Sequence, residues 1–270
     1  MQKVLTEGSR KGICNICGIS CSLTQDHVPP KGSINPRKMG IRSLAQTVNA
    51  VDPKIVRLSQ NGVKFRSLCS QCNNNRLGKN FDPALNQFSH KVTQIILTRS
   101  QLVLPPKVDI KLQPQRIARS VIGHLLAAEI REDMSFPPVS VPMRNLMRQY
   151  FLDTSADFPT DLNLYFWPYR SSRQVILRGV GVLSGEHIVV GDFLKYLPVA
   201  FWLTYQAPHG VRAIMQDREI SIRGIGIDDW STVAVGTNKQ DTFRADWPEA
   251  PDNNEVVVIN DNLCFIAEAA

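Results

Sequence analysis

The sequence Cys14-Asn15-Ile16-Cys17, followed after 51 residues by Cys69-Ser70-Gln71-Cys72-Asn73-Asn74-Asn75, determines the expected fold of the first third of this 270-residue chain. Each stretch carries a Cys-x-x-Cys pair, and two pairs supply the four thiolates of a closed, tetrahedral zinc site. Unrelated core thiols are the weaker alternative, because two matched pairs seldom arise by chance. Cys21 lies outside the pattern and is interpreted as a small buried thiol, or else as a substitute ligand. We therefore predict a structural Zn²⁺ bound by Cys14, Cys17, Cys69 and Cys72.

An Asp-His pair lies between the two cysteine pairs. Residues 22–28 alternate in polarity and end at Pro29-Pro30, which predicts a short strand that carries His27 at its end. A histidine that is neutral near pH 7 can act as a general base, and the Asp26 carboxylate is a hard ligand suited to Mg²⁺ or Mn²⁺. Neighbouring strand residues face opposite ways, so the two side chains converge only if the strand bends. In most proteins such a pair is a cap or a core feature; inside a double cysteine knuckle we interpret it as functional.

These motifs, taken together over residues 12–82, resemble the HNH endonucleases, the zinc-knuckle branch of the ββα-metal nucleases. The resemblance implies a β-hairpin and a helix that hold one catalytic divalent ion, with the zinc as a structural brace. It implies that His27 is the base, that Asp26 is one metal ligand, and that the second ligand is Asn73, with Asn74 as the alternative. The three successive asparagines also suit a helix cap and turn. Many nucleases of this kind serve phage, mobile-element or bacterial defence functions.

The sequence departs from the family pattern at one position. The family has a middle asparagine about five residues before the third cysteine, and Lys64 occupies that place here. Asn61-Gly62 lies nearby, but this dipeptide is explained as the turn of a hairpin between residues 55–58 and 63–66. The departure bears on how rigidly the base is held, whereas the base and the metal ligands are retained.

The charge is distributed unevenly along the chain. The net charge is +7, but residues 1–104 contain 15 Lys and Arg against 4 Asp and Glu, whereas residues 105–270 contain 16 against 20. Such an excess of positive charge favours a polyphosphate partner through counterion release, although basic residues also serve merely to solvate a surface. We predict that the first part binds DNA, with RNA as an open alternative. The candidate phosphate contacts are Lys31, Arg66, Arg76 and Lys79.

The remaining sequence predicts an α+β protein in four parts: a loose N-terminus (1–12), the HNH-like zinc module (13–84), a linking helix (85–104) and a second domain (105–270). Helices are expected at 85–97, 115–130 and 143–152. A mostly antiparallel sheet should follow, with strands at 162–167, 174–183, 188–190, 199–205, 211–215, 219–225, 232–235 and 255–259. His124, in an apolar helical stretch, is interpreted as a core or partner-satisfied residue. The second domain is expected to select the target, sense a signal, or bind a protein partner or another copy of the chain.

The sequence carries no apolar run long enough to cross a bilayer and no secretory signal, which predicts a cytoplasmic protein without a membrane partner. Cysteine pairs in a reducing compartment indicate metal binding rather than disulfides. The leading hypothesis is a metal-dependent endonuclease that cuts or nicks DNA. The rival hypothesis, from a different class, is a zinc-stabilised module that binds nucleic acid without cleaving it.

Overall fold

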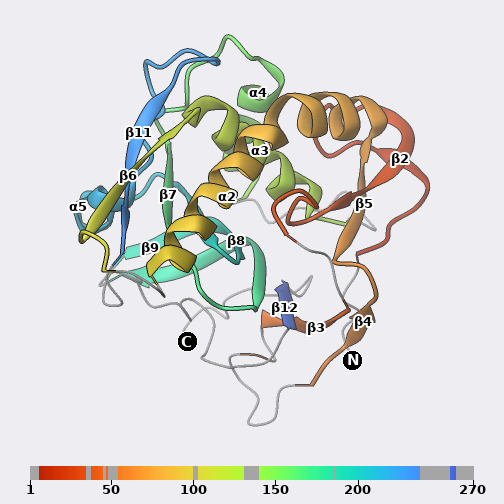
Figure 1. Ribbon diagram of the computed structural model, residues 1–270. Coiled ribbons are helices and arrows are strands. Elements are labelled where there is room, and N and C mark those ends of the chain that lie inside the picture. Colours follow the sequence, from red (N-terminus) through yellow and green to blue (C-terminus); the bar gives the residue numbers. More distant parts are fainter. Residues whose placement is uncertain are drawn as a thin grey trace.

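The computed structural model describes residues 6–34, 38–44, 47, 54–99, 103–130, 140–184, 187–237 and 256–259. The described chain is an α+β protein whose helices pack between a small sheet and a larger one (Figure 1). Most strand pairs are antiparallel, as predicted, and the parallel pairs are those of β12 (Val256–Ile259) with β3 (Met39–Ser43) and β8 (Gln174–Ser184).

The small sheet carries both cysteine pairs at one end. Its strand order is β1 (Lys11–Ile13), β2 (Ser20–His27) and β5 (Lys64–Cys69), all antiparallel. The pairing of β2 with β5 shifts register between Thr24 and Gln25, so the strand is irregular just before Asp26. The strand predicted at residues 22–28 is therefore confirmed, and a bulge next to a candidate site re-aims the side chains that follow it.

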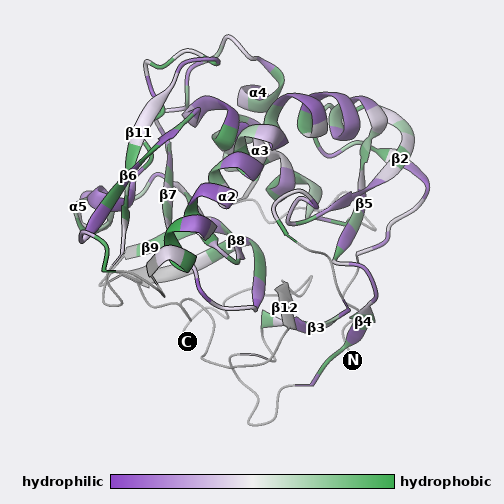
Figure 2. Ribbon diagram, in the orientation of Figure 1, coloured by the Kyte–Doolittle hydropathy of each residue, from purple (hydrophilic) through white to green (hydrophobic). Residues whose placement is uncertain are grey.

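A long helical segment follows β5 at once. It begins as the π-helix η1 (Gln71–Phe81) and continues as the α-helix α2 (Asp82–Arg99). The wide turns of η1 bring the N–H of Asp82 to the carbonyl of Leu77, five residues back. Figure 2 shows hydrophilic and hydrophobic residues alternating around these turns, as expected for a segment with one side on the core. The helix predicted at 85–97 is confirmed and is longer at both ends.

Helices α3 (Pro114–Ala127) and α4 (Ser140–Leu152) confirm the helices predicted at 115–130 and 143–152. Helix α3 packs against η1 and α2, and α4 packs against α3. Gly123 of α3 lies so close to η1 and α4 that an added Cβ would be 2.6 Å from Leu77 and 2.7 Å from Phe151. The last carbonyls of α3 accept hydrogen bonds from the cysteine-bearing region, because Asn15 donates to Leu126 (2.9 Å) and Ser67 donates to Ala127 (2.6 Å). These caps fix the end of α3 on the small sheet.

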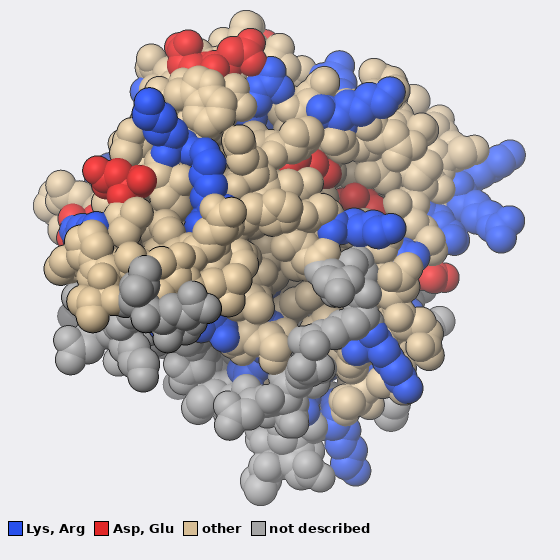
Figure 3. Space-filling model, in the orientation of Figure 1, with Lys and Arg blue, Asp and Glu red and all other residues tan. Residues whose placement is uncertain are grey.

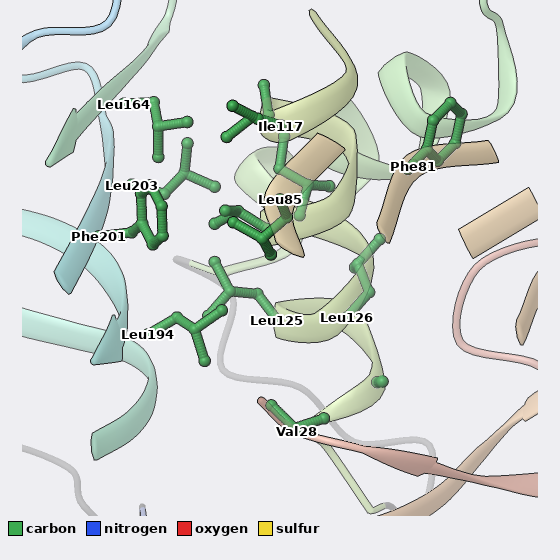
Figure 4. Close-up of a cluster of buried hydrophobic side chains, with 14 of the residues drawn as sticks. Val28, Phe81, Leu85, Ile117, Leu125, Leu126, Leu164, Leu194, Phe201 and Leu203 are labelled. Atoms are coloured by element: carbon green, nitrogen blue, oxygen red, sulfur yellow. The ribbon is translucent and has the colours of Figure 1, made fainter. Parts of the chain in front are cut away.

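The larger sheet has the order β4-β3-β12-β8-β9-β10-β7. Its remaining strands are β4 (Arg57–Ser59), β7 (Leu162–Pro168), β9 (His187–Tyr196) and β10 (Val199–Tyr205). Figure 4 shows one core between this sheet and the helices, with Leu85, Ile117 and Leu125 facing Leu194 and Phe201 and extending to Val28 at the end of β2. Strands β3 and β4 come from the segment between the cysteine pairs, so this sheet combines strands from before residue 84 with strands from after residue 104.

Three details of the predicted elements are wrong. The hairpin expected between 55–58 and 63–66 does not form, because β4 pairs with β3 while β5 pairs with β2. The turn itself is present, with Gly62 at φ 68°, but it sends the two strands into different sheets. The strand expected at 211–215 is the helix α5 (His209–Met215), whose buried Val211 and Met215 lie one helical turn apart.

The third wrong element is the strand expected at 219–225. Within those described residues only Glu219 makes an isolated bridge, to Tyr165, and the short 3₁₀ turn η2 (Gln216–Arg218) precedes it. The strand expected at 232–235 is confirmed as β11 (Ser231–Gly236). It pairs with β6 (Lys107–Leu112), an unpredicted strand whose Val108, Ile110 and Leu112 alternate with polar residues.

Candidate functional site

The four paired cysteines come together. Cys14 and Cys17 lie in the turn between β1 and β2, while Cys69 ends β5 and Cys72 opens η1. Their sulfur atoms all lie within 4.8 Å of one another, and the Sγ atoms of Cys17 and Cys69 are 3.9 Å apart. A tetrahedral site with Zn–S bonds of about 2.3 Å places its sulfurs about 3.8 Å apart. This cluster can hold a metal ion such as zinc.

The surroundings of the cluster favour a thiolate at Cys14, whereas burial raises the pKa of Cys17. The N–H of Cys69 donates to Cys14 Sγ (3.3 Å), and the N–H of Cys72 donates to Cys69 Sγ (3.4 Å). A hydrogen bond from the Cys72 thiol lowers the pKa of Cys14 to about 4 and raises the pKa of Cys72. Cys21 is half-buried rather than buried, its Sγ lies 3.4 Å from the Ile19 carbonyl, and it is not one of the four clustered sulfurs.

His27 ends β2 as predicted and is half-buried. Its Nε2 lies 3.1 Å from the backbone carbonyl of Asn61, in the turn before β5. A carbonyl only accepts, so Nε2 carries the proton and Nδ1 keeps the basic lone pair. Burial and the charge of Lys64, its partner in the strand register, lower the pKa of His27. The imidazole is therefore neutral near pH 7 and able to accept a proton.

Asp26 faces the other way, into the protein. Its carboxylate is 7% exposed, and Oδ2 lies 2.9 Å from Nδ1 of His124 on α3. Nε2 of His124 lies 3.0 Å from Oδ1 of Asp82, which also accepts from Ser120 (2.7 Å). The side chains of Asp26, His124 and Asp82, named here the buried triad, thus link β2, α3 and α2. The interpretation of His124 as a partner-satisfied residue is confirmed.

Electrostatics within the buried triad favour a charged imidazole. Burial alone lowers the pKa of His124, but the carboxylates of Asp82 and Asp26 raise it to about 10. Burial raises the pKa of Asp26, against the opposing effect of His124. For Asp82 the burial effect is outweighed by His124 and Ser120, so its pKa lies below the ordinary value. An imidazolium therefore lies between two carboxyl groups, at least one of them ionised.

Asn73 and Asn74, the alternative second ligands, lie in different environments. Asn73 is buried, and its side-chain nitrogen donates to Thr24 Oγ1 (2.9 Å) and to the carbonyl of Gln25 (3.1 Å), next to Asp26. Both its N–H groups are directed at β2, which leaves the amide oxygen as the atom that a metal would take. Asn74 is exposed and donates along the helix to Ser70 (3.0 Å). Of the two, the structure brings Asn73 to the strand of Asp26 and His27.

The four candidate phosphate contacts also differ in exposure and in their contacts within the protein. Lys31 and Lys79 are exposed. Arg66 is half-buried, with Nη1 3.5 Å from the carbonyl of Gly8. Arg76 donates to the carbonyl of Leu152 at 2.8 Å and so caps the end of α4. Arg76 therefore has a structural contact within the protein, whereas Lys31 and Lys79 extend into solvent.

Sequence reasoning did not find the buried triad. A histidine within an apolar helix signals a buried titratable group, and such a group requires a partner. The partner itself cannot be read from the sequence, because Asp26 and His124 are 98 residues apart. Asp82 lies in the predicted zinc module (13–84), just before the helix predicted at 85–97, and the sequence assigns it no role.

No protein-family profile, curated protein or solved structure matches this chain. In the described part of the chain, none of the helices combines the length and the apolar character needed to cross a bilayer.

Proposed function

We propose that this chain is a metal-dependent, HNH-like endonuclease that hydrolyses phosphodiester bonds in DNA. The observation that carries the proposal is the position of His27, a neutral histidine at a strand end whose ring is held by the Asn61 carbonyl. The strand, its partner β5 and the helix η1 surround it in a ββα arrangement beside four clustered cysteines. The carbonyl of Asn61 compensates for the family asparagine that Lys64 replaces, since it orients the ring without a side chain.

His27 would serve as the general base. Its free Nδ1 takes a proton from a water molecule as the water oxygen bonds to phosphorus and the opposite phosphorus–oxygen bond breaks. The leaving oxygen is protonated from solvent. The hydrogen bond from Nε2 to Asn61 keeps the basic nitrogen fixed while the ring becomes charged, because the carbonyl also stabilises an imidazolium.

Asp26, the sequence neighbour of His27, and Asn73 carry oxygen donors of the kind that Mg²⁺ or Mn²⁺ takes, although the carboxylate of Asp26 faces the protein interior. Asp26 Oδ2 is bound to His124 and the nitrogen of Asn73 is bound to β2, so one oxygen of each side chain remains for the ion. A hard divalent cation takes such carboxylate and amide oxygens. When bound, the ion supplies Lewis-acid stabilisation of the charge that grows on the phosphate. The cysteine cluster would hold a structural zinc, which has no open position for substrate.

The surface charge supports a DNA substrate. Of the four acidic residues within 1–104, Asp26 and Asp82 belong to the buried triad, Glu7 is exposed, and Asp52 lies outside the described residues. The exposed surface of this part is therefore more basic than its composition alone suggests. The rival function, a binding module without catalysis, shares this surface but has no use for a neutral, oriented His27.

Cleavage of supercoiled plasmid tests the proposal. The wild type should nick or linearise plasmid when Mg²⁺ or Mn²⁺ is added, and His27→Ala should lower the rate by about 10²–10⁴-fold. His90→Ala, at an exposed histidine on α2, is the matched control and should cleave normally. Equal cleavage by the wild type and His27→Ala would remove His27 as the base. Binding without cleavage by any variant would favour the binding module, and a parallel assay with RNA would reveal a preference for that substrate.

A further inference from the structure

The buried triad joins the candidate metal site to a helix outside the ββα arrangement. His124 is completely buried and lies one turn before the end of α3, where Asn15 and Ser67 cap the last carbonyls. Its two ring nitrogens reach carboxylates on two other elements, β2 and α2. The position of the imidazole is thus set by three packed elements rather than by its own side-chain torsions.

The hydrogen-bond chemistry of the triad constrains His124 further. An ionised carboxylate only accepts hydrogen bonds, so the ring nitrogen that faces Asp82 donates to it. Hydrogen bonds to charged groups are shorter and stronger than neutral ones, and the observed 2.9 and 3.0 Å suit them. His124 thus holds Oδ2 of Asp26, whichever of the two groups carries the shared proton.

We propose that His124 is a positioning residue for the catalytic cation, which it controls by orienting the carboxylate of Asp26. This inference rests on the proposed function, because it takes Asp26 as a ligand of that cation. Partners that orient a metal ligand commonly contribute about 10–100-fold to metal affinity or activity. Loss of the imidazole removes the hydrogen bond that holds Oδ2 of Asp26 and frees the carboxylate to rotate, so a cation binds less well.

A direct metal titration tests the proposal on the full-length, zinc-loaded protein. His124→Gln keeps one side-chain nitrogen as a donor, but this nitrogen cannot bond to carboxylates on two sides or carry a charge. We expect it to weaken Mn²⁺ binding by about 10–100-fold, as measured by electron paramagnetic resonance of free Mn²⁺ without DNA. Plasmid cleavage should shift to higher Mn²⁺ by the same factor and recover much of its maximal rate. Zinc content should remain that of the wild type.

The matched control is Leu125→Ala, in the same helix turn but directed at the large sheet (Figure 4). It should lower thermal stability while leaving Mn²⁺ affinity unchanged, which separates positioning from general damage to α3. Equal Mn²⁺ affinity in His124→Gln and the wild type would overturn the inference while the proposed nuclease function stands. A wild type that neither binds Mn²⁺ nor cleaves DNA would overturn both.

A measurement on the wild type covers the case in which His124→Gln does not fold. In protein labelled with ¹⁵N-histidine, the Nδ1–H proton that His124 shares with Asp26 should shift when Mg²⁺ is added. In Asp26→Asn the same addition should leave it unchanged. An unperturbed His124 signal in wild-type protein saturated with Mg²⁺ would contradict the inference.

Discussion

Asn73 and Asn74 show how much one position along a helix changes what a side chain can do. Asn73 is tied to β2 through both its N–H groups, whereas Asn74 bonds only to Ser70 on its own helix. The geometry therefore favours Asn73 over Asn74 as the proposed second ligand of the catalytic ion. The hydrogen bonds of Asn73 also have a structural role, because they hold η1 against the strand that carries Asp26 and His27.

Alanine substitutions at the two asparagines should separate them. Asn73→Ala removes an oxygen ligand and two hydrogen bonds, so the Mn²⁺ concentration for half-maximal cleavage should rise by at least about tenfold. It should also lower the free energy of unfolding by about 1–3 kcal/mol, because buried acceptors on β2 lose their donors. Asn74→Ala should change either quantity little. If the substitution at Asn74 had the larger effect on the metal response, the assignment of Asn73 would be incorrect.

At the scale of elements, the two cysteine pairs join two segments that are far apart in sequence. They connect the turn between β1 and β2 to the junction of β5 and η1, so a bound ion would brace the small sheet against its helix. The brace also reaches α3, because Asn15 between the first two cysteines caps that helix. Loss of the ion should therefore be felt well beyond the cysteines.

Zinc analysis tests this brace. Purified protein should contain about one zinc ion per chain, and Cys72→Ala should reduce the content to near zero with a lower unfolding temperature. Cys21→Ala is the matched control, since Cys21 is not among the clustered sulfurs, and it should keep the ion. Folded wild-type protein without any bound metal would contradict the prediction.

The packing of α3 on η1 depends on a residue without a side chain. Gly123→Ala would place a methyl group 2.6 Å from the Leu77 side chain and 2.7 Å from the Phe151 ring, which is too close unless these buried side chains move. We expect a loss of about 1–3 kcal/mol in the free energy of unfolding, reduced by the better helix propensity of alanine. The same substitution at Gly210 in α5 meets nothing within 4 Å and should be neutral or slightly stabilising. Urea unfolding of the Gly123→Ala and Gly210→Ala variants would measure the two changes in the free energy of unfolding.

The elements that the sequence predicted correctly are those whose apolar spacing is long and regular. The apolar periodicity of α2 and α4 reflects one buried face, whereas α3 and β7 are apolar because they are buried nearly throughout. The wrong predictions arise where a short pattern fits both a strand and a helix, or where a strand pairs with another that is distant in the sequence. Five residues at 211–215 suit a strand or a helical turn equally, and nothing local indicates that β4 and β5 enter different sheets.

The same reasoning explains which parts of the candidate site were accessible from sequence. Each Cys-x-x-Cys pair and the Asp26-His27 pair can be recognised from a short spacing, because residues that are close in sequence stay close in the folded protein. The buried triad depends on the packing of α3 against β2, which joins residues 98 positions apart. A partner for His124 could be expected from its burial, but only the tertiary structure identifies which two carboxylates supply it.

At the scale of the whole molecule, charge separates by region. Figure 3 shows Lys and Arg side chains projecting from the side that carries β2, β4 and β5, while most acidic side chains in this view lie over β6, β11 and α5. A duplex would therefore approach the side that also carries His27. Each phosphate contact to B-DNA adds about 0.9 to the slope of log affinity against log salt.

Neutralising matched sets of cations should test this polarity. Replacing Lys31, Arg66 and Lys79 by Gln should weaken DNA binding and reduce the salt slope by about 0.9 for each residue that contacts phosphate. Replacing Lys107, Lys111 and Arg212, three exposed cations beyond the ββα arrangement, removes the same formal charge and should leave the slope nearly unchanged. Arg76 is left unchanged in both variants because it caps α4. Fluorescence anisotropy at several salt concentrations would measure DNA binding by both variants. If both variants lost the same amount of salt slope, net charge rather than this surface would attract the DNA.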